Sequence, residues 1–245
     1  MSEHIHPSGH YQYKELLIGG RWAEPGSERV FEVRSPHDGR LAGRTPEAVE
    51  LDVDRAVAAA RRAFDLGPWP RMSPSERSGV IARFSALHRA EAEELAALTT
   101  AENGSAIWFT RMLQNIVGDR TDDFLRLAAD HPWEEELVDA SGLRTLVRRE
   151  PVGVVAAVIL WNAPQQSALV KLIPALLAGN AVILKPSPET ALDGVRLGEL
   201  RARLSSSNRS SASSATTRSE RTIATRARLT TRSSGRFLIR VSMAR

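Results

Sequence analysis

Apolar residues recur along the chain in three patterns, and each pattern predicts a different kind of element. Short apolar stretches at residues 15–24 and 29–36 predict two strands around a turn, and residues 38–46 continue in the same style. From residue 52 to residue 130, apolar residues recur every three or four positions, which predicts amphipathic helices. The third pattern, a nearly continuous apolar run, follows after residue 150.

Start and stop signals divide the helical part. A first helix carries four apolar residues on one face, which are Val53, Val57, Ala60 and Phe64. Ser73 and Glu76 form a capping-box pattern that predicts the start of a second helix, with a break near Glu91 and a stop at Gly104. Residues 105–130 predict another amphipathic helix.

The apolar runs at residues 151–161 and 181–186 predict two strands buried on both faces, as in a parallel sheet. A helical pattern that ends at Gly179 separates them, so strand, helix and strand form a βαβ unit. Just before this unit, residues 131–149 predict a hairpin with its turn at residues 140–142. The fold class is therefore α/β.

The regular pattern ends at Leu204. Residues 205–245 are rich in Ser, Thr and Ala, which predicts a disordered tail. They contain nine Arg and one Glu, a formal charge of +8, whereas the whole chain carries +4, so residues 1–204 carry −4. Only the tail could therefore bind nucleic acid through its charge, and we do not expect nucleic acid to be a main partner.

Composition excludes several classes of chemistry. The chain contains no cysteine, which excludes disulfides, thiolate metal sites and a cysteine nucleophile. The N-terminus lacks the pattern of a signal peptide, and the longest apolar run is too short for a membrane helix, so we predict a cytoplasmic protein with no membrane contact. Three N-terminal histidines, His4, His6 and His10, are expected on a flexible terminus, and no metal is predicted.

Polar residues follow both predicted parallel strands. Asn162 comes directly after the first strand and Lys185 ends the second, so we expect them to face one cleft at the carboxyl edge of the sheet. Asn162 could stabilise an oxyanion, and Lys185 could bind ribose hydroxyls or a phosphate. An asparagine after a strand is also a common turn residue, and a lysine at the end of a strand is commonly solvated. The residues alone therefore do not decide between a binding site and ordinary strand ends. No Gly-x-Gly-x-x-Gly follows the first strand.

Several ordered motifs resemble the aldehyde dehydrogenase superfamily. They are "WNAP" at 161–164, Lys171 and "PALLAGNAVILKPSPET" at 174–190, preceded in order by "LIGGRW", "SPHDGRLAGRTPEA", "PWPRMSPSERSGVIARFSALH" and "AEELAALTTAENG". The resemblance covers residues 14–204 without a large gap. It implies an incomplete doubly wound nucleotide-binding domain, with N-terminal helices and a hairpin that bridges subunits.

The resemblance assigns roles to single residues. Asn162 matches the catalytic oxyanion-hole asparagine, and Lys185 matches the lysine that hydrogen-bonds the adenosine ribose of NAD(P). The strand end that lines the cofactor cleft matches Ile159, Leu160 and Trp161, with Leu160 replacing the family's usual proline. Ser187 and Pro188 belong to the same cofactor site. Many NAD-preferring members carry a glutamate where this chain has Pro188, so both NAD and NADP are expected as cofactors.

The resemblance also implies a division of the chain. Residues 1–13 are a flexible N-terminus, 14–130 the N-terminal part of the cofactor-binding domain, 131–149 the bridging hairpin through which a homo-oligomer would form, 150–204 the first βαβ unit, and 205–245 the tail. The tail begins inside an expected helix and has the composition of a GC-rich gene read out of frame. A frameshift near residue 204 is therefore our hypothesis, with a native basic tail as the alternative.

The family oxidises an aldehyde to a carboxylic acid with NAD(P), through a cysteine thiolate and a glutamate that follow well beyond the matched motifs. This chain contains no cysteine, so the resemblance implies an aldehyde dehydrogenase truncated before its catalytic domain and inactive alone. The alternative function is a non-catalytic interaction module. Such a module would pair with a full-length relative, or bind nucleic acid through its basic tail.

Overall fold

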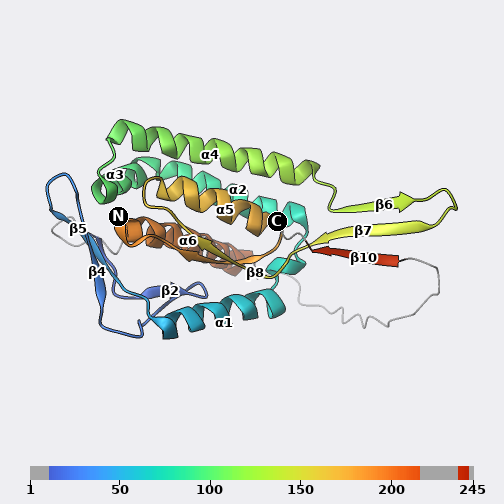
Figure 1. Ribbon diagram of the computed structural model, residues 1–245, viewed down its shortest axis with the longest axis horizontal. Helices are drawn as coiled ribbons and strands as arrows, with labels where there is room; N and C mark the ends of the chain where they lie inside the picture. Colours follow the sequence, from blue (N-terminus) through green and yellow to red (C-terminus); the bar gives the residue numbers. More distant parts are fainter. Residues whose placement is uncertain (1–10, 216–236, 243–245) are drawn as a thin grey trace.

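The structure, a computed structural model, describes residues 11–215 and 237–242, with side chains for residues 11–204 (Figure 1). The α-helices are α1 (Glu50–Leu66), α2 (Pro74–Ala90), α3 (Ala92–Asn103), α4 (Ile107–Asp130), α5 (Pro164–Leu177) and α6 (Ala191–Ala215), with 3₁₀ turns η1 (Trp69–Arg71) and η2 (Pro188–Thr190). The strands are β1 (Tyr11–Gln12), β2 (Leu16–Ile18), β3 (Arg21–Ala23), β4 (Val30–Arg34), β5 (Leu41–Pro46), β6 (Glu134–Val138), β7 (Arg144–Glu150), β8 (Val154–Val158), β9 (Ala181–Lys185) and β10 (Phe237–Ser242).

The predicted βαβ unit is confirmed. Strands β8 and β9 pair in parallel, from Val154 opposite Ala181 to Val158 opposite Lys185, and α5 connects them. Asn180 fixes the start of the pair, because its side-chain oxygen accepts the N–H groups of Val152 at 2.8 Å and of residue 153 at 3.0 Å. Helices α1 and α5 both contact the two strands, and the strands lie between them in Figure 1.

The expectation that β8 is buried on both faces is wrong at its carboxyl end. Ala157 and Ile159 are 1% and 6% exposed, whereas Val158 and Leu160 are 58% and 61% exposed. Successive side chains of a strand point to opposite faces, so one face turns toward the main core and the other is left open here. This open face lies at the carboxyl edge of the sheet, where Asn162 follows β8 and Lys185 ends β9.

The N-terminal strands differ from the predicted pair. Residues 15–24 form a hairpin of their own, with β2 antiparallel to β3, while β4 pairs with β5. The reason is the Gly19-Gly20 turn, since both glycines have positive φ and allow the chain to reverse at once. Residues 11–13, expected to belong to a flexible terminus, are instead ordered, because β1 pairs with β5 and Tyr13 is 1% exposed.

The helical signals agree with the structure except on α1. Ser73 and Glu76 form the capping box of α2, Glu91 separates α2 from α3, and Gly104 ends α3 in the left-handed region at φ 76°. On α1, however, Val53 and Val57 are exposed, so half of the predicted apolar face is not buried among the described residues.

The main core lies between α2, α3, α4, α5, α6 and β8. Its buried apolar side chains include Leu95, Val117, Ile173, Leu197 and Leu200. A second, smaller core joins the N-terminal strands to α3 and α6 through Tyr13, Val33, Leu98, Ala191 and Leu192. The strands β1, β4 and β5 are therefore held against α3 and α6.

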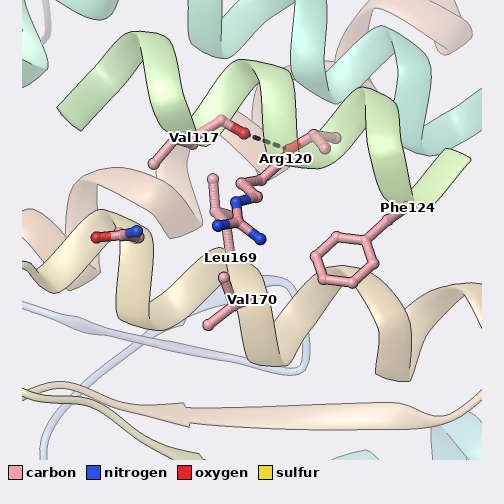
Figure 2. A pocket seen from close by; sticks show the side chains of 7 residues that line it. Val117, Arg120, Phe124, Leu169 and Val170 are labelled. Carbon is pink, nitrogen blue, oxygen red and sulfur yellow. Dashed lines mark hydrogen bonds between the residues drawn. The ribbon is translucent and has the colours of Figure 1, made fainter. Parts of the chain in front are cut away.

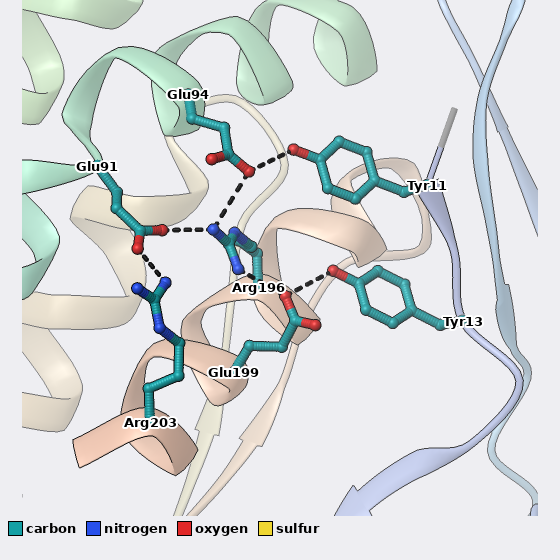
Figure 3. A network of polar contacts seen from close by, with 7 residues as sticks. All are labelled: Tyr11, Tyr13, Glu91, Glu94, Arg196, Glu199 and Arg203. Atoms are coloured by element: carbon teal, nitrogen blue, oxygen red, sulfur yellow. Dashed lines mark hydrogen bonds and ion pairs between the residues drawn. The ribbon is translucent and has the colours of Figure 1, made fainter. Parts of the chain in front are cut away.

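A buried polar network reinforces this second junction (Figure 3). The Arg196 guanidinium on α6 pairs with Glu199 at 2.9 Å, with Glu94 at 3.2 Å and with Glu91. Tyr11 and Tyr13 donate their hydroxyls to Glu94 and Glu199, at 2.9 and 3.0 Å. The network thus ties the N-terminal segment, α3 and α6 together.

The hairpin β6–β7 is confirmed and extends away from the helical body (Figure 1). Within residues 205–245, where disorder was expected, α6 continues to Ala215 and the six residues of β10 pair in parallel with β7. Residues 205–215 contain no Gly or Pro, so no helix breaker stands at Leu204. The predictions for residues 1–10, 216–236 and 243–245 lie outside the described residues. No helix among the described residues is long and apolar enough to cross a membrane.

Candidate functional site

The two strand ends that carry the predicted site residues are in register. Val158 lies opposite Lys185, and the N–H of Ile159 donates to the Lys185 carbonyl at 3.0 Å. Residues 159–163, the β8–α5 loop, and residues 186–190, the β9–α6 segment, therefore leave the same edge of the sheet. The expected adjacency of the two strand ends is confirmed, since neighbouring strands lie about 4.8 Å apart.

The seven predicted site residues divide by exposure. Leu160, Trp161, Asn162, Lys185 and Pro188 are exposed, and Ser187 is half-buried. Ile159 is different, because its side chain is 6% exposed and belongs to the main core. Its side chain therefore packs in the core, and its place in the strand end that lines the cofactor cleft stays a prediction. The alternation along β8 explains the difference, since Leu160 takes the open face and Ile159 the core face.

Three side chains that sequence reasoning did not assign to the site hold the β8–α5 loop. Asn103, at the end of α3, donates its amide to the carbonyls of Trp161 at 3.2 Å and Asn162 at 3.3 Å. Ser167 accepts the N–H of Leu160 at 3.5 Å, and the Lys171 ammonium donates to the Val158 carbonyl. The only sequence signal for Asn103 is its position before Gly104 at the end of a helix. Asparagine is common at such turns, so this position does not indicate a functional role.

The β9–α6 segment is held just as closely. The Ser187 hydroxyl donates to the Glu189 carboxylate. This bond, together with the Glu189 N–H and the charge of Lys185, lowers the pKa of Glu189. Pro186 packs on α6 at Gly194, where an added Cβ would lie 2.6 Å from the proline Cβ. The segment therefore presents Lys185 from a fixed turn.

A buried carboxylate anchors the start of α6 behind this segment. Glu102 accepts the N–H groups of Leu192 at 2.8 Å and Asp193 at 3.1 Å, which satisfies two of the free donors at a helix N-terminus. Burial, and then the charge of Asp193, raise the pKa of Glu102 well above its usual range. Burial also raises the pKa of Asp193 to about 7. Burial therefore favours the protonated form of both carboxyls.

Asp193 continues into a chain of buried hydrogen bonds. The Gln165 amide donates to Asp193 at 2.7 Å, and the Gln165 oxygen lies 2.9 Å from the His88 ring nitrogen. Burial lowers the pKa of His88, so the neutral ring is favoured. Gln165 is in the first turn of α5, so these hydrogen bonds link α5 to α6 beneath the strand ends.

A shallow depression lies between α4 and α5 (Figure 2). Its lining is Val117, Arg120, Thr121, Phe124, Gln166, Leu169 and Val170, and it includes none of the predicted site residues. The Thr121 hydroxyl is already bonded to the Val117 carbonyl at 2.9 Å. Arg120 and Gln166 are the other polar residues of the lining, and the rest of it is apolar. No group of three or more His, Asp or Glu that could hold a metal occurs among the residues that the structure describes.

The strand-end site offers hydrogen-bond donors and one positive charge. Lys185 supplies an ammonium, Asn162 an amide, and Leu160 and Trp161 an apolar surface beside them. This donor set fits a ligand with hydroxyls, phosphates and a flat ring, such as a dinucleotide. The sequence contains no cysteine, so the site has no thiolate nucleophile of its own.

Comparison with known proteins identifies the relatives of this chain. The model of the "Aldehyde dehydrogenase family" matches residues 22–205. Phenylacetaldehyde dehydrogenase of Pseudomonas fluorescens is 36% identical over 197 residues, which are 76% of this chain and 38% of that protein. The NADP/NAD-dependent aldehyde dehydrogenase PuuC of Escherichia coli is 36% identical over 186 residues, 76% of this chain and 37% of that protein.

Solved structures give the same result. The structure of a Mycobacterium tuberculosis aldehyde dehydrogenase complexed with NAD+ superposes with a TM-score of 0.74 at 38% identity, over 80% of this chain and 41% of that one. An NAD-dependent aldehyde dehydrogenase from Sinorhizobium meliloti reaches 0.76 at 34% identity, over 82% of this chain and 41% of that one. The chain spans about two-fifths of the length of the curated relatives it matches.

Proposed function

Because this chain belongs to the aldehyde dehydrogenase family over residues 22–205, we propose that it forms one wall of an NAD(P)-binding cleft used for aldehyde oxidation. The register of β8 and β9, which brings Asn162 and Lys185 to one edge of the sheet, carries this proposal. The similar enzyme from Mycobacterium tuberculosis, which is complexed with NAD+, supports it.

Each exposed residue of the strand ends has a role in this proposal. Lys185 donates hydrogen bonds to the adenosine ribose, and its charge attracts the phosphates. Leu160 and Trp161 line the cleft, while Ser187 and Pro188 shape the turn beside Lys185. Asn162 directs its amide toward the oxygen of the aldehyde, where negative charge develops during the reaction. NAD(P), when bound, accepts the hydride of that oxidation.

We further propose that the chain alone does not oxidise aldehydes. Its residues can bind and orient, but the sequence contains no cysteine to attack the carbonyl carbon. Asn162 would then stabilise charge on an oxyanion that no group of this chain can generate. Its catalytic role would require residues that these 245 do not include.

The test separates binding from catalysis on one preparation. The purified chain is mixed with NAD+ or NADP+ and an aldehyde, and reduced cofactor is followed by absorbance. We expect no formation of reduced cofactor above a blank without protein, but saturable binding of the oxidised cofactor by calorimetry. Turnover that stays with the chain through further purification would contradict the first part, and absent binding would contradict the second.

The hairpin favours a second candidate function, which is pairing with another subunit. Leu137 and Val138 are 53% and 61% exposed on a hairpin that extends from the body (Figure 1). We propose a homo-oligomer through this hairpin. Light scattering after size-exclusion chromatography should give the mass of an oligomer for the natural chain, and a smaller mass after Leu137→Ser and Val138→Ser together. An unchanged mass would show that the hairpin does not form the interface between subunits.

The other partner and location predictions rest on the sequence. Nucleic acid is not proposed as a partner, because the positive charge lies in residues 205–245 and not around the strand ends. A gel-shift experiment would contradict this if binding appeared and weakened steeply with salt, as counterion release requires. The cytoplasmic location stays a prediction, which cell fractionation can check.

A further inference from the structure

The carboxyl end of α3 touches both loops that leave the sheet edge. Two consecutive residues make the contacts. Glu102 holds the start of α6, behind the β9–α6 segment, through the N–H groups of Leu192 and Asp193. Asn103 holds the β8–α5 loop through the carbonyls of Trp161 and Asn162. One helix end, distant in sequence, thus holds both sides of the site.

The Asn103 side chain is itself fixed. Its oxygen accepts the N–H of Ser105 at 2.9 Å, so the amide nitrogen must point the other way, toward the loop. The backbone after it turns sharply, because Gly104 is in the left-handed region and a Cβ there would lie 2.7 Å from the Pro36 ring. The amide is therefore oriented by its own turn and does not depend on the loop that it contacts.

The two carbonyls that Asn103 contacts flank Asn162 in the chain. The Trp161 carbonyl belongs to the peptide group before Asn162, and the Asn162 carbonyl to the peptide group after it. Planar peptide groups leave only φ and ψ free at each residue, so fixing both planes fixes the direction of the Asn162 Cα–Cβ bond. The two hydrogen bonds, of 3.2 and 3.3 Å, are long and exposed, so they orient the loop more than they stabilise the fold.

From this geometry we propose that Asn103 is a positioning residue that sets the backbone of Asn162 and aims its amide. The use of that aim in aldehyde chemistry rests on the proposed function, but the positioning itself does not. Asn103 acts only through Asn162, since its own amide hydrogens are donated to the loop.

The test uses an isosteric change in the unliganded full chain. Asn103→Asp keeps an oxygen for the Ser105 N–H and removes the donor to the loop. Asn115→Asp, on the exposed face of α4, is the matched control with the same change of charge. Nuclear magnetic resonance of the labelled chain follows the backbone amides of residues 162 and 163, whose peptide groups contain the two carbonyls, and the side-chain amide of Asn162.

We expect Asn103→Asp to move these three resonances, while Asn115→Asp leaves them in place. The melting temperature should fall by no more than about 4 °C, because only two weak contacts are lost. Adding NAD+ should then shift the Asn162 side-chain amide less in Asn103→Asp than in the natural chain.

Two results would overturn the positioning role. Unchanged resonances of Asn162 in Asn103→Asp would mean that the loop holds its conformation without Asn103. Loss of the folded spectrum in both Asn103→Asp and Asn103→Ala would mean that the residue is structural. If NAD+ moves no resonance of the natural chain, the proposed function fails, while the unliganded comparison still decides the role of Asn103.

Discussion

The N–H of Ile159 donates to the carbonyl oxygen of Lys185 at 3.0 Å, one residue beyond the last pair of β8 and β9. This bond continues the parallel ladder to the point where both loops begin. Asn162 follows three residues later on one side, and the Lys185 ammonium projects on the other. The site is therefore a consequence of strand register, and changes on its two sides should affect the same ligand.

The choice between NAD and NADP should depend on position 188. Pro188 lies three residues after Lys185 and carries no charge that could repel the 2′-phosphate of NADP. We expect NAD+ and NADP+ to bind with comparable affinity. In Pro188→Glu, NADP+ should bind about tenfold more weakly relative to NAD+, because two like charges lie close together. Calorimetric titration of both cofactors checks this. If the ratio of the NAD+ and NADP+ affinities were the same in Pro188→Glu as in the natural chain, the 2′-phosphate would not lie near residue 188.

Stability should decrease as the pH rises through neutrality. The pKa of Asp193 is about 7 in the folded chain and 3.8 for an ordinary aspartate, so folding favours the protonated form. The contribution is fully present below about pH 4 and is lost as the pH rises through about 7. Burial raises the pKa of Asp193 and outweighs the hydrogen bonds from the Thr99 hydroxyl at 2.8 Å and the Gln165 amide at 2.7 Å, which favour its ionised form.

The corresponding measurement is the melting temperature at pH 5.5 and pH 8.5, values chosen on either side of about 7. We expect the higher melting temperature at the lower pH. Asp193→Asn imitates the protonated side chain and should flatten the difference, while Asp130→Asn, at the exposed end of α4, should not. A chain that melts at the same temperature at both pH values would contradict the raised pKa of the buried Asp193 carboxyl.

Arg196 should be the residue whose loss most weakens the junction of the N-terminal strands with α3 and α6. Its side chain is 4% exposed, and three glutamates surround it, Glu91, Glu94 and Glu199 (Figure 3). Arg196→Met leaves these carboxylates without their buried cation and should lower the free energy of unfolding by about 3 kcal/mol.

The matched control for Arg196→Met is Arg126→Met, whose side chain is 70% exposed in its pair with Asp123. That substitution should change the free energy of unfolding by less than about 1 kcal/mol, as is usual for a surface pair. Urea unfolding of both variants measures the difference. Equal effects of the two substitutions would show that the Arg196 network is no stronger than a surface ion pair.

Local patterns predicted the helices and the βαβ unit because those patterns are short-range. The capping box at Ser73 and the stop at Gly104 depend on residues within a few positions of one another. The parallel pairing of β8 and β9 follows from the order strand, helix, strand, which brings both carboxyl ends to one edge of the sheet. The position of the two candidate site residues was therefore accessible from the sequence.

Long-range contacts were not accessible in the same way. Asn103 contacts residues 58 and 59 positions away, and Glu102 contacts residues 90 and 91 positions away. Nothing local distinguishes these two from an ordinary helix end. The face that Ile159 presents was missed for a related reason, since a run of apolar residues hides the alternation that decides which side chain enters the core.

The central claim is that the strand ends of β8 and β9 bind a nicotinamide dinucleotide through Lys185. Calorimetric titration of NAD+ into the natural chain, Lys185→Ala and Lys14→Ala tests it most directly, since Lys14 is an exposed lysine in the N-terminal segment and outside the site. We expect weak saturable binding by the natural chain and by Lys14→Ala, and a dissociation constant about tenfold higher for Lys185→Ala. Equal affinity of all three chains, or no binding by any of them, would contradict it.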